Sequence, residues 1–234
     1  MSNVFDCSVD TDLLTGMRLA KIAIARSQLV VLPTDTVYGV AADAFSPAGV
    51  EALLAAKGRG PQSPPPVLIA NQAAMNALAT DIHAIAFELA EAFWPGALTM
   101  IFKSQPSLAW NLGETRGTVA LRIPDHKIAL ALLQETGPLA VSSANLTGQP
   151  AATTAAAAQA YLGKSVEVYL DAGVSPKGES STILDLTGLS GQPEGKIRVV
   201  RAGALSVEKI RRVAGDLLEV DLPNDSVAQQ EGDN

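Results

Sequence analysis

At Leu29-Val30-Val31-Leu32-Pro33-Thr34-Asp35-Thr36-Val37-Tyr38-Gly39, an apolar run passes directly into a cluster of polar side chains. Four apolar residues closed by a proline are typical of a short buried strand. A turn alone does not require two threonines, an aspartate and a tyrosine, so the polar residues indicate a binding site. Neither GxxxxGKS/T nor GxGxxG occurs, so a nucleotide site here would be neither a P-loop nor a dinucleotide-binding fingerprint.

Helices and strands alternate outward from this run. Ser46-Pro47 is an N-cap followed by proline at the first helical position, and a proline-rich stretch at 61–66 predicts an extended connection. Hydrophobic spacing predicts helices at about 10–27 (capped by Asp10 or Thr11), 47–57, 71–79, 83–93, 127–136, 153–161 and 206–213, and strands at about 29–32, 97–103, 118–123, 138–142, 166–170, 182–186 and 197–200. Consecutive strands in the second half predict an α/β domain with one twisted mixed sheet flanked by helices.

A length of 234 residues with 47% hydrophobic residues suits one domain with its own core. We expect a mobile N-terminus at 1–9, a catalytic domain at 10–213 and an acidic, disordered tail at 214–234. No segment reaches the roughly 18 to 20 apolar residues that span a bilayer, and the N-terminus lacks a signal-peptide pattern. A cytoplasmic protein without a membrane partner is expected.

The net charge of −7 is concentrated at one end of the chain. Six acidic residues follow Gly215 with no lysine or arginine among them, and without these six charges the remainder carries −1. A nearly neutral body must meet a polyphosphate with locally clustered cations and not with a general positive field. A broad basic face for RNA is not indicated.

Cysteine and histidine are too few for several common sites. Cys7 is the single cysteine, which excludes an internal disulfide and a multi-cysteine metal site, and its acidic surroundings disfavour a catalytic thiol. With only His83 and His126, no Ser-His-Asp set and no HExxH motif is present.

Four cationic residues lie at the ends of predicted helices or strands. Lys57 and Arg59 lie at the exit of a helix, whereas Arg122 and Arg201 end predicted strands, where ligands of α/β sheets bind. Each alone is more often a surface charge, but together they favour an anion site. Hydroxyl-rich segments at 141–148 and 181–182 could bind a ligand or simply cap turns, and the residues alone leave both interpretations open.

Taken in order, these motifs resemble the YrdC-like threonylcarbamoyl-AMP synthases. The matching motifs are Pro33-Thr-Asp-Thr-Val-Tyr-Gly39, Lys57-Gly-Arg59, Trp94-Pro-Gly-Ala-Leu-Thr99, Arg122-Ile-Pro-Asp-His126, Ser143-Ala-Asn145 with Gly148, Ser181-Thr-Ile183 and Arg201-Ala-Gly203. The resemblance implies a YrdC-like twisted sheet with a concave cationic cavity. It also implies a nucleotidyltransferase that joins L-threonine, bicarbonate or CO2 and ATP into threonylcarbamoyl-AMP and pyrophosphate, for threonylcarbamoyladenosine modification of tRNA.

Carried over by motif position, the resemblance implies two sets of binding residues. L-Threonine would be held by Thr36, Arg122, Ser143 and Ser181. ATP would be held by Lys57, Arg59, Ser63, Thr118, Asn145, Thr153 and Arg201, with Mg²⁺ carried on its phosphates. The reaction needs alignment more than a covalent nucleophile, so no catalytic acid or base and no protein-bound metal is assigned.

The sequence departs from the family pattern in two places. After Lys57-Gly58-Arg59 the family usually has an asparagine and often a histidine, whereas here Ser63 is the nearest match to the asparagine, Pro64-Pro65-Pro66 follows and the histidine is missing. The chain also ends without the extra C-terminal domain of longer members, so the function of that domain is expected to be missing. Trp94 is expected in the core and a turn, and His126 suits a helix start as well as a ligand contact.

Two other functions fit parts of the pattern. An RNA-binding or ribosome-associated module of the same fold would use its cavity for structured RNA and would show steep salt dependence. A carbamoyl-transferring domain, as in hydrogenase maturation, would act on another acceptor within a much longer chain. For the synthase, the partners are ATP, L-threonine, bicarbonate and the tRNA threonylcarbamoyl-transfer machinery, with weak direct tRNA or RNA binding left open.

Overall fold

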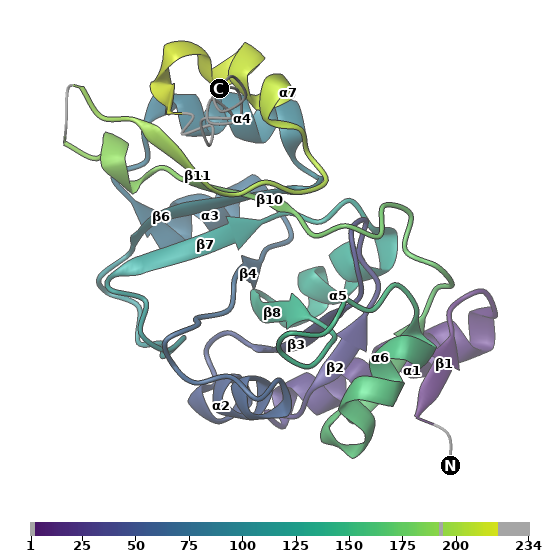
Figure 1. Cartoon of the computed structure of the whole chain (residues 1–234). Helices are drawn as coiled ribbons and strands as arrows, with labels where there is room; N and C mark the ends of the chain where they lie inside the picture. The colour runs from purple at the N-terminus through teal and green to yellow at the C-terminus, as the bar shows by residue number, and fades with distance from the viewer. Residues whose placement is uncertain (1–2, 192–193, 220–234) are drawn as a thin grey trace, which may run out of the picture.

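The computed structural model describes residues 3–191 and 194–219 and has a central sheet with helices packed on it (Figure 1). The helices are α1 (Asp10–Ala25), α2 (Pro47–Ala56), α3 (Gln72–Leu78), α4 (Ala84–Phe93), α5 (Lys127–Thr136), α6 (Ala155–Leu162) and α7 (Val207–Ala214), with 3₁₀ turns η1 (Gly163–Ser165), η2 (Thr187–Leu189) and η3 (Gly215–Leu217). The strands are β1 (Val4–Asp6), β2 (Val30–Leu32), β3 (Gly39–Asp43), β4 (Val67–Leu68), β5 (Ala79–Thr80), β6 (Leu98–Ser104), β7 (Thr118–Arg122), β8 (Leu139–Ser143), β9 (Val168–Asp171), β10 (Thr182–Asp185), β11 (Ile197–Arg201) and β12 (Leu218–Glu219).

The sheet mixes parallel and antiparallel pairs, which confirms the predicted α/β class. Its strand order is β1-β9-β2-β3-β8-β4-β7-β6-β10-β11-β12, and β5 pairs with β6. The pairs β1–β9, β9–β2, β4–β7, β6–β10 and β11–β12 are parallel, and the remaining pairs are antiparallel. None of the helices in residues 3–191 and 194–219 has the length and apolarity that crossing a membrane requires.

Helices cover both faces of the part of the sheet that contains β2. Successive side chains of a strand point to opposite faces, and all three residues of β2 are buried. Val30 and Leu32 pack in one core cluster with α1 and α5, whereas Val31 packs in another with α2 and α6. This burial on both faces explains why β2 is a continuous apolar run instead of an alternating one.

A third core cluster fills the other half of the sheet. It joins β6 and β7 with α3, α4 and α7, and Figure 1 shows α4 and α7 together beside β10 and β11. The apolar side chains of β6 that face this cluster include Leu98, Met100 and Phe102, which alternate along the strand as predicted for one buried face. This cluster also includes residues of β4, β8 and α2, each of which contributes to one of the other two clusters, so the three clusters adjoin in the middle of the sheet.

Two predicted helix starts have different outcomes. Ser46 caps α2 as predicted, because its hydroxyl accepts a 3.0 Å hydrogen bond from the backbone N–H of Gly49 and Pro47 occupies the first turn. The predicted cap of α1 by Asp10 or Thr11 is wrong. Val9 is the N-cap and makes no side-chain bond, and Asp10 lies inside the first turn, where its charge favours the positive end of the helix.

One central strand, β3, has no counterpart among the predicted elements. It lies between β2 and β8, and four of its five residues are buried. Its sequence is Gly-Val-Ala-Ala-Asp, in which only valine favours strands, so propensity gives no signal. Small residues fit here because a Cβ added to Gly39 would lie 2.6 Å from Cγ1 of Val141.

The ordered domain extends farther at both ends than predicted, into the segments 1–9 and 214–234. Residues 4–6 form β1, which pairs with β9, so a mobile segment at 1–9 is wrong for this part. At the other end, η3 and β12 extend the domain to Glu219 because β12 pairs with β11 and buries Leu218. A tail beginning at 214 is therefore also wrong for residues 214–219, and its remainder, 220–234, lies outside the described residues.

A Gly16→Ala substitution tests the close packing of α1 on β1 and β9. Alanine favours a helix interior over glycine by about 1 kcal/mol, so without this close packing the variant would be more stable. In the structure, a Cβ at Gly16 would lie 2.8 Å from Cβ of Phe5 and 2.9 Å from Cδ2 of Leu170. We expect overpacking to outweigh the gain and to lower the free energy of unfolding in urea by about 1 kcal/mol. The exposed neighbour substitution Thr15→Ala is the control and should not lower it.

Candidate functional site

The polar segments come together over one face of the twisted sheet. The turn 33–38 follows β2, and the pairing of Gly39 with Ser143 puts this turn beside the end of β8. Arg122 ends β7, and Arg201 ends β11 opposite Ile183 near the start of β10. Through β4, Arg122 is level with Leu139 at the start of β8, so Arg122 and Ser143 belong to opposite ends of these strands. The site therefore forms over a face of the sheet and not along one edge.

A cavity of about 290 Å³ lies over this face, where alternate residues of β6 (Thr99 and Ile101) and β7 (Thr118, Ala120 and Arg122) line it. Seven of the eleven predicted binding residues line it: Thr36, Arg59, Thr118, Arg122, Ser143, Ser181 and Arg201. Among the described lining residues three are arginines and none is acidic. The segment 64–66, which the sequence left without an assigned contact, forms part of the wall.

The other four predicted residues do not line the cavity. Lys57 is buried below it, where its ammonium donates to the carbonyl oxygens of Ser143 and Asn145. The Asn145 amide donates to the carbonyls of Leu146 (2.9 Å) and Gln149 (2.7 Å). Ser63 and Thr153 are half-buried on the neighbouring loops. Their roles toward ATP stay predictions.

Lys57 holds the turn that carries Ser143. Its side chain is 1% exposed and bridges two carbonyl oxygens of the Ser143-Ala144-Asn145 turn. Burial, with a smaller contribution from the positive charge of Arg59, lowers the pKa of Lys57 to about 8. Lys57 therefore positions the Ser143–Asn145 turn from outside the cavity lining. The dipoles of the two carbonyl groups stabilise its charge.

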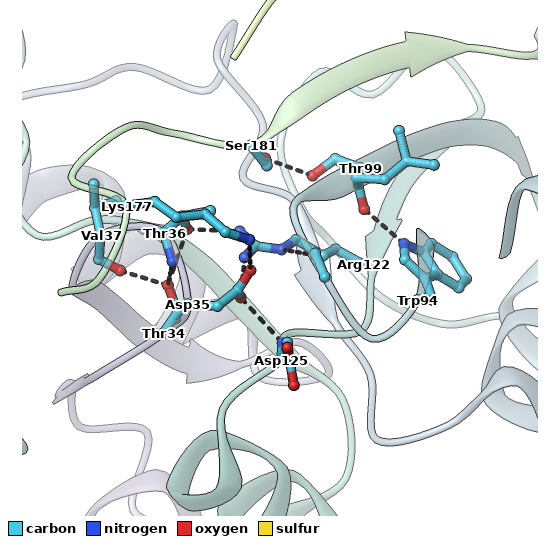
Figure 2. A network of polar contacts seen from close by, with 12 residues as sticks. Thr34, Asp35, Thr36, Val37, Trp94, Thr99, Arg122, Asp125, Lys177 and Ser181 are labelled. Carbon is cyan, nitrogen blue, oxygen red and sulfur yellow. Dashed lines mark hydrogen bonds and ion pairs between the residues drawn. The ribbon is translucent and has the colours of Figure 1, made fainter. Parts of the chain in front are cut away.

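A buried ion pair joins the turn after β2 to the end of β7. Asp35 Oδ1 accepts from Nη2 of Arg122 at 2.5 Å and from the backbone N–H of Asp125 at 3.0 Å, as Figure 2 shows. Asp35 Oδ2 accepts from Nζ of Lys177 at 3.1 Å. Both side chains of the Asp35–Arg122 pair are almost fully buried, at 5% and 7% exposed.

The environment keeps Asp35 ionised. Burial opposes the charged form, but the charges of Arg122 and Lys177 and the hydrogen bonds to Lys177 and Asp125 outweigh it, so the pKa of Asp35 lies below its ordinary value of 3.8. Burial lowers the pKa of Arg122, and Asp35 opposes that shift. Arginine stays charged at any pH a protein tolerates, so both members of the pair are ionised.

Arg122 has more N–H donors than its described protein acceptors use. A guanidinium carries five N–H groups, and three protein acceptors bind it: the carbonyl oxygen of Gly96 (2.8 Å), the hydroxyl of Thr36 (3.0 Å) and Asp35. Among the described residues two N–H groups thus remain without a protein acceptor. A carboxylate or phosphate in the cavity could take both through the planar fork that suits arginine.

A second polar cluster, formed by Arg201, Ser181 and Thr99, lines the same cavity as Arg122. Nη2 of Arg201 donates to the carbonyl oxygen of Ser181 at 2.7 Å and to its hydroxyl at 3.3 Å. The Ser181 hydroxyl also lies 2.8 Å from that of Thr99, which is 1% exposed (Figure 2). Burial, with the charge of Arg59 as the smaller cause, lowers the pKa of Arg201. Nε of Arg201 also donates to the Ser181 carbonyl at 3.2 Å, so Arg201 holds Ser181 in place by three bonds.

The loop between β9 and β10 adds residues that sequence patterns did not single out. Lys177 bonds Asp35, and the backbone N–H of the next residue, Gly178, donates to the carbonyl of Thr36 at 3.0 Å. Asp35 belongs to the Pro33–Gly39 motif and directly precedes Thr36, and this position could have marked it as a site residue. Lys177 has no motif that marks it, because its partner is distant in the sequence.

Trp94, His126 and Cys7, which the sequence also brought into consideration, lie outside the cavity lining. Trp94 packs in the third core cluster and its indole N–H donates to the carbonyl of Leu98 at 2.6 Å, which confirms the core and turn prediction. His126 is the half-buried N-cap position of α5, and burial lowers its pKa. Cys7 donates to the carbonyl of Phe5, and burial raises its pKa to about 11. Within the described residues, no three His, Cys, Asp or Glu side chains group as a metal site.

Comparison with known proteins finds relatives along most of the chain. Residues 23–203 match the Sua5/YciO/YrdC family model, whose description is telomere recombination. A protein of Mycobacterium leprae (strain TN), provisionally named a threonylcarbamoyl-AMP synthase, is 48% identical over 215 residues, which cover 92% of this chain and 95% of that protein. The threonylcarbamoyl-AMP synthase of Pyrococcus abyssi is 36% identical over 203 residues, or 86% of this chain and 58% of that protein.

A solved structure agrees with this similarity. The crystal structure of P. abyssi Sua5 complexed with L-threonine superimposes with a TM-score of 0.79 at 34% sequence identity, covering 86% of this chain and 58% of that one. The similarity therefore includes both sequence and fold.

An Asp35→Asn substitution should leave the Arg122 charge buried without its partner. Breaking a buried pair on one side costs about 3 to 5 kcal/mol of unfolding free energy, so we expect a loss of at least about 3 kcal/mol at pH 7 in urea unfolding. The folded-state pKa of Asp35 is depressed, so its contribution is present above the ordinary pKa of 3.8 and is lost as the pH falls through the lower folded value. The difference from the unsubstituted protein should shrink only below about pH 3.8.

The matched control is Asp81→Asn, which removes an exposed partner of Lys103 that lies 3.1 Å away. Exposed pairs contribute about 0 to 1 kcal/mol. If the substitution at Asp35 destabilises no more than the one at Asp81, the pair is not what holds Arg122.

Proposed function

The chain belongs to the Sua5/YciO/YrdC family, and from that membership we propose that it synthesises threonylcarbamoyl-AMP from L-threonine, bicarbonate or CO2 and ATP, with release of pyrophosphate. The observation that carries the proposal is the cavity lined by Arg59, Arg122 and Arg201, with no acid among its described lining residues. The relative that was solved in complex with L-threonine supports the amino acid as one substrate.

The amino-acid end of the cavity is assigned to the region of Arg122. Its two remaining N–H groups suit the carboxylate of L-threonine, and the hydroxyl-bearing Thr36 and Ser181 line the same cavity. Asp35 does not line the cavity, so it balances the charge of Arg122 from behind without meeting the carboxylate. The arginine can therefore remain charged in the free protein and still bind an anion.

The phosphate end is assigned to Arg59 and Arg201. Threonine carboxylate, carbamate and triphosphate are all anionic, and two unit charges 4 Å apart repel by about 4 kcal/mol at an effective dielectric constant of 20. Arginines that are already oriented oppose this repulsion without reorganisation during the reaction. Arg201 is oriented by Ser181, and Nε of Arg59 donates to the hydroxyl of Thr147 at 3.1 Å.

Alignment is the proposed source of rate enhancement. In the proposed reaction the carbamate oxygen attacks the α-phosphorus of ATP and pyrophosphate leaves, so the residues need to hold two anions in line. Mg²⁺ enters as part of the ATP substrate, with phosphate oxygens as its ligands. The proposal includes a cytoplasmic location and delivery of the product to the machinery that modifies tRNA with threonylcarbamoyladenosine.

Pyrophosphate release should depend on L-threonine. With ATP, Mg²⁺ and bicarbonate, we expect the purified protein to release pyrophosphate at least about tenfold faster with L-threonine than with L-serine, because one methyl group in a pocket is worth about tenfold or more. Mass spectrometry should find the adenylate. Equal rates with L-serine or without an amino acid would exclude the synthase.

An Arg59→Ala substitution should act on ATP and not on L-threonine. Losing one charge-assisted contact to a phosphate is expected to raise the KM for ATP by about tenfold or more, with the KM for L-threonine changed by less than about twofold. Arg18→Ala removes an exposed arginine on α1, outside the cavity lining, and should change neither. Equal effects on both KM values would contradict the assignment of Arg59 to the phosphates.

A further inference from the structure

The hydroxyls of Thr34 and Thr36 form a short chain of hydrogen bonds in the cavity wall. Both residues line the cavity, and their oxygens lie 3.0 Å apart (Figure 2). Thr34 Oγ1 also lies 2.6 Å from the carbonyl oxygen of Val37 and 3.2 Å from the backbone N–H of Thr36. Nη1 of Arg122 lies 3.0 Å from Thr36 Oγ1.

These contacts fix which hydroxyl donates. A carbonyl oxygen only accepts, so the single proton of the Thr34 hydroxyl goes to Val37. Thr34 Oγ1 can then only accept, and the proton between the two hydroxyls must come from Thr36. The guanidinium of Arg122 only donates, so Thr36 Oγ1 accepts from it.

The remaining capacity of Thr36 is that of an acceptor. A hydroxyl has one proton and two acceptor positions. The proton is used by Thr34 and one acceptor position by Arg122, so one acceptor position is left at the cavity. A ligand group that binds Thr36 Oγ1 must therefore be a donor.

We propose that Thr34 is a positioning residue, which fixes the Thr36 hydroxyl as the acceptor for the amino group of bound L-threonine. The inference rests on the proposed function, which places the substrate carboxylate on Arg122. Thr36 Oγ1 is 3.0 Å from a nitrogen of that guanidinium. The α-amino group is attached to the carbon next to the carboxylate, whereas the β-hydroxyl is one bond farther away, so the amino group is the donor within reach.

An acceptor suits the amino group through the whole proposed reaction. The ammonium, the neutral amine and the carbamate nitrogen each keep at least one N–H. In carbamate formation the lone pair of the neutral amine forms the N–C bond to CO2, one C=O electron pair moves onto oxygen, and the nitrogen loses a proton to water. A donor at this position would compete for that lone pair, whereas the Thr36 oxygen leaves it free.

The test measures binding of three small molecules to the full chain by calorimetry without ATP. L-Threonine is compared with (R)-3-hydroxybutyrate, which lacks the amino group, and with L-2-aminobutyrate, which lacks the hydroxyl. The quantity of interest is the affinity ratio between L-threonine and each analogue, because a general loss of folding or of cavity shape lowers all three affinities together.

Thr34→Val should lower the affinity for L-threonine and L-2-aminobutyrate about three- to tenfold and leave that for (R)-3-hydroxybutyrate within about twofold, since one hydrogen bond is at stake. Thr34→Ser keeps the hydroxyl and should restore all affinities to within about twofold. Thr136→Val removes a hydroxyl that bonds the carbonyl of Leu132 outside the cavity lining and should change no ratio.

The outcomes separate this inference from the proposed function. If the unsubstituted protein binds L-threonine but Thr34→Val weakens all three ligands equally, the inference is wrong and the function stands. If the loss falls on the ligands with a β-hydroxyl, Thr36 serves that group and the inference is also wrong. If the unsubstituted protein binds no L-threonine, the proposed function fails and the inference fails with it.

Discussion

Arg122 carries a charge that it cannot lose, and its side chain lies almost fully buried. Such a charge persists in a folded protein only with a negative partner and with acceptors for its N–H groups. Asp35 supplies the charge, and Gly96 and Thr36 supply the acceptors. Because Asp35 follows β2 and Arg122 ends β7, the pair joins two strands whose apolar side chains pack in different core clusters.

The same pair sets the electrostatics of the cavity. Its one carboxylate lies behind the lining, so the surface that a ligand meets keeps the three arginines and their donors. Within the described residues, neither Arg59 nor Arg201 has a carboxylate partner. Two anionic substrates would balance these charges when they bind, which is the physical reason that the proposed joining of an amino acid and a nucleotide suits this cavity.

Most of the fold was predictable because its helices and seven of the described strands carry clear hydrophobic patterns, whereas the edge strands β1 and β12 do not. The strand β3 was not, since Gly39-Val-Ala-Ala-Asp43 owes its place to close packing between two neighbours and not to propensity. In the site, motifs marked Thr36, Arg122 and Ser181, but they could not show that Lys57 is turned toward backbone carbonyls. Contacts such as that between Asp35 and Lys177 join segments that are far apart in the sequence. The local sequence pattern does not show which distant segments meet in the fold.

The most direct test of this account is a crystal structure of the chain grown with L-threonine. We predict the ligand carboxylate within hydrogen-bond distance of the two guanidinium N–H groups of Arg122 that lack a protein acceptor, with the bond from Arg122 to Asp35 intact. An L-threonine molecule bound away from Arg122, or an Arg122 side chain that leaves Asp35 to reach it, would contradict the claim that a prearranged ion pair presents the binding site.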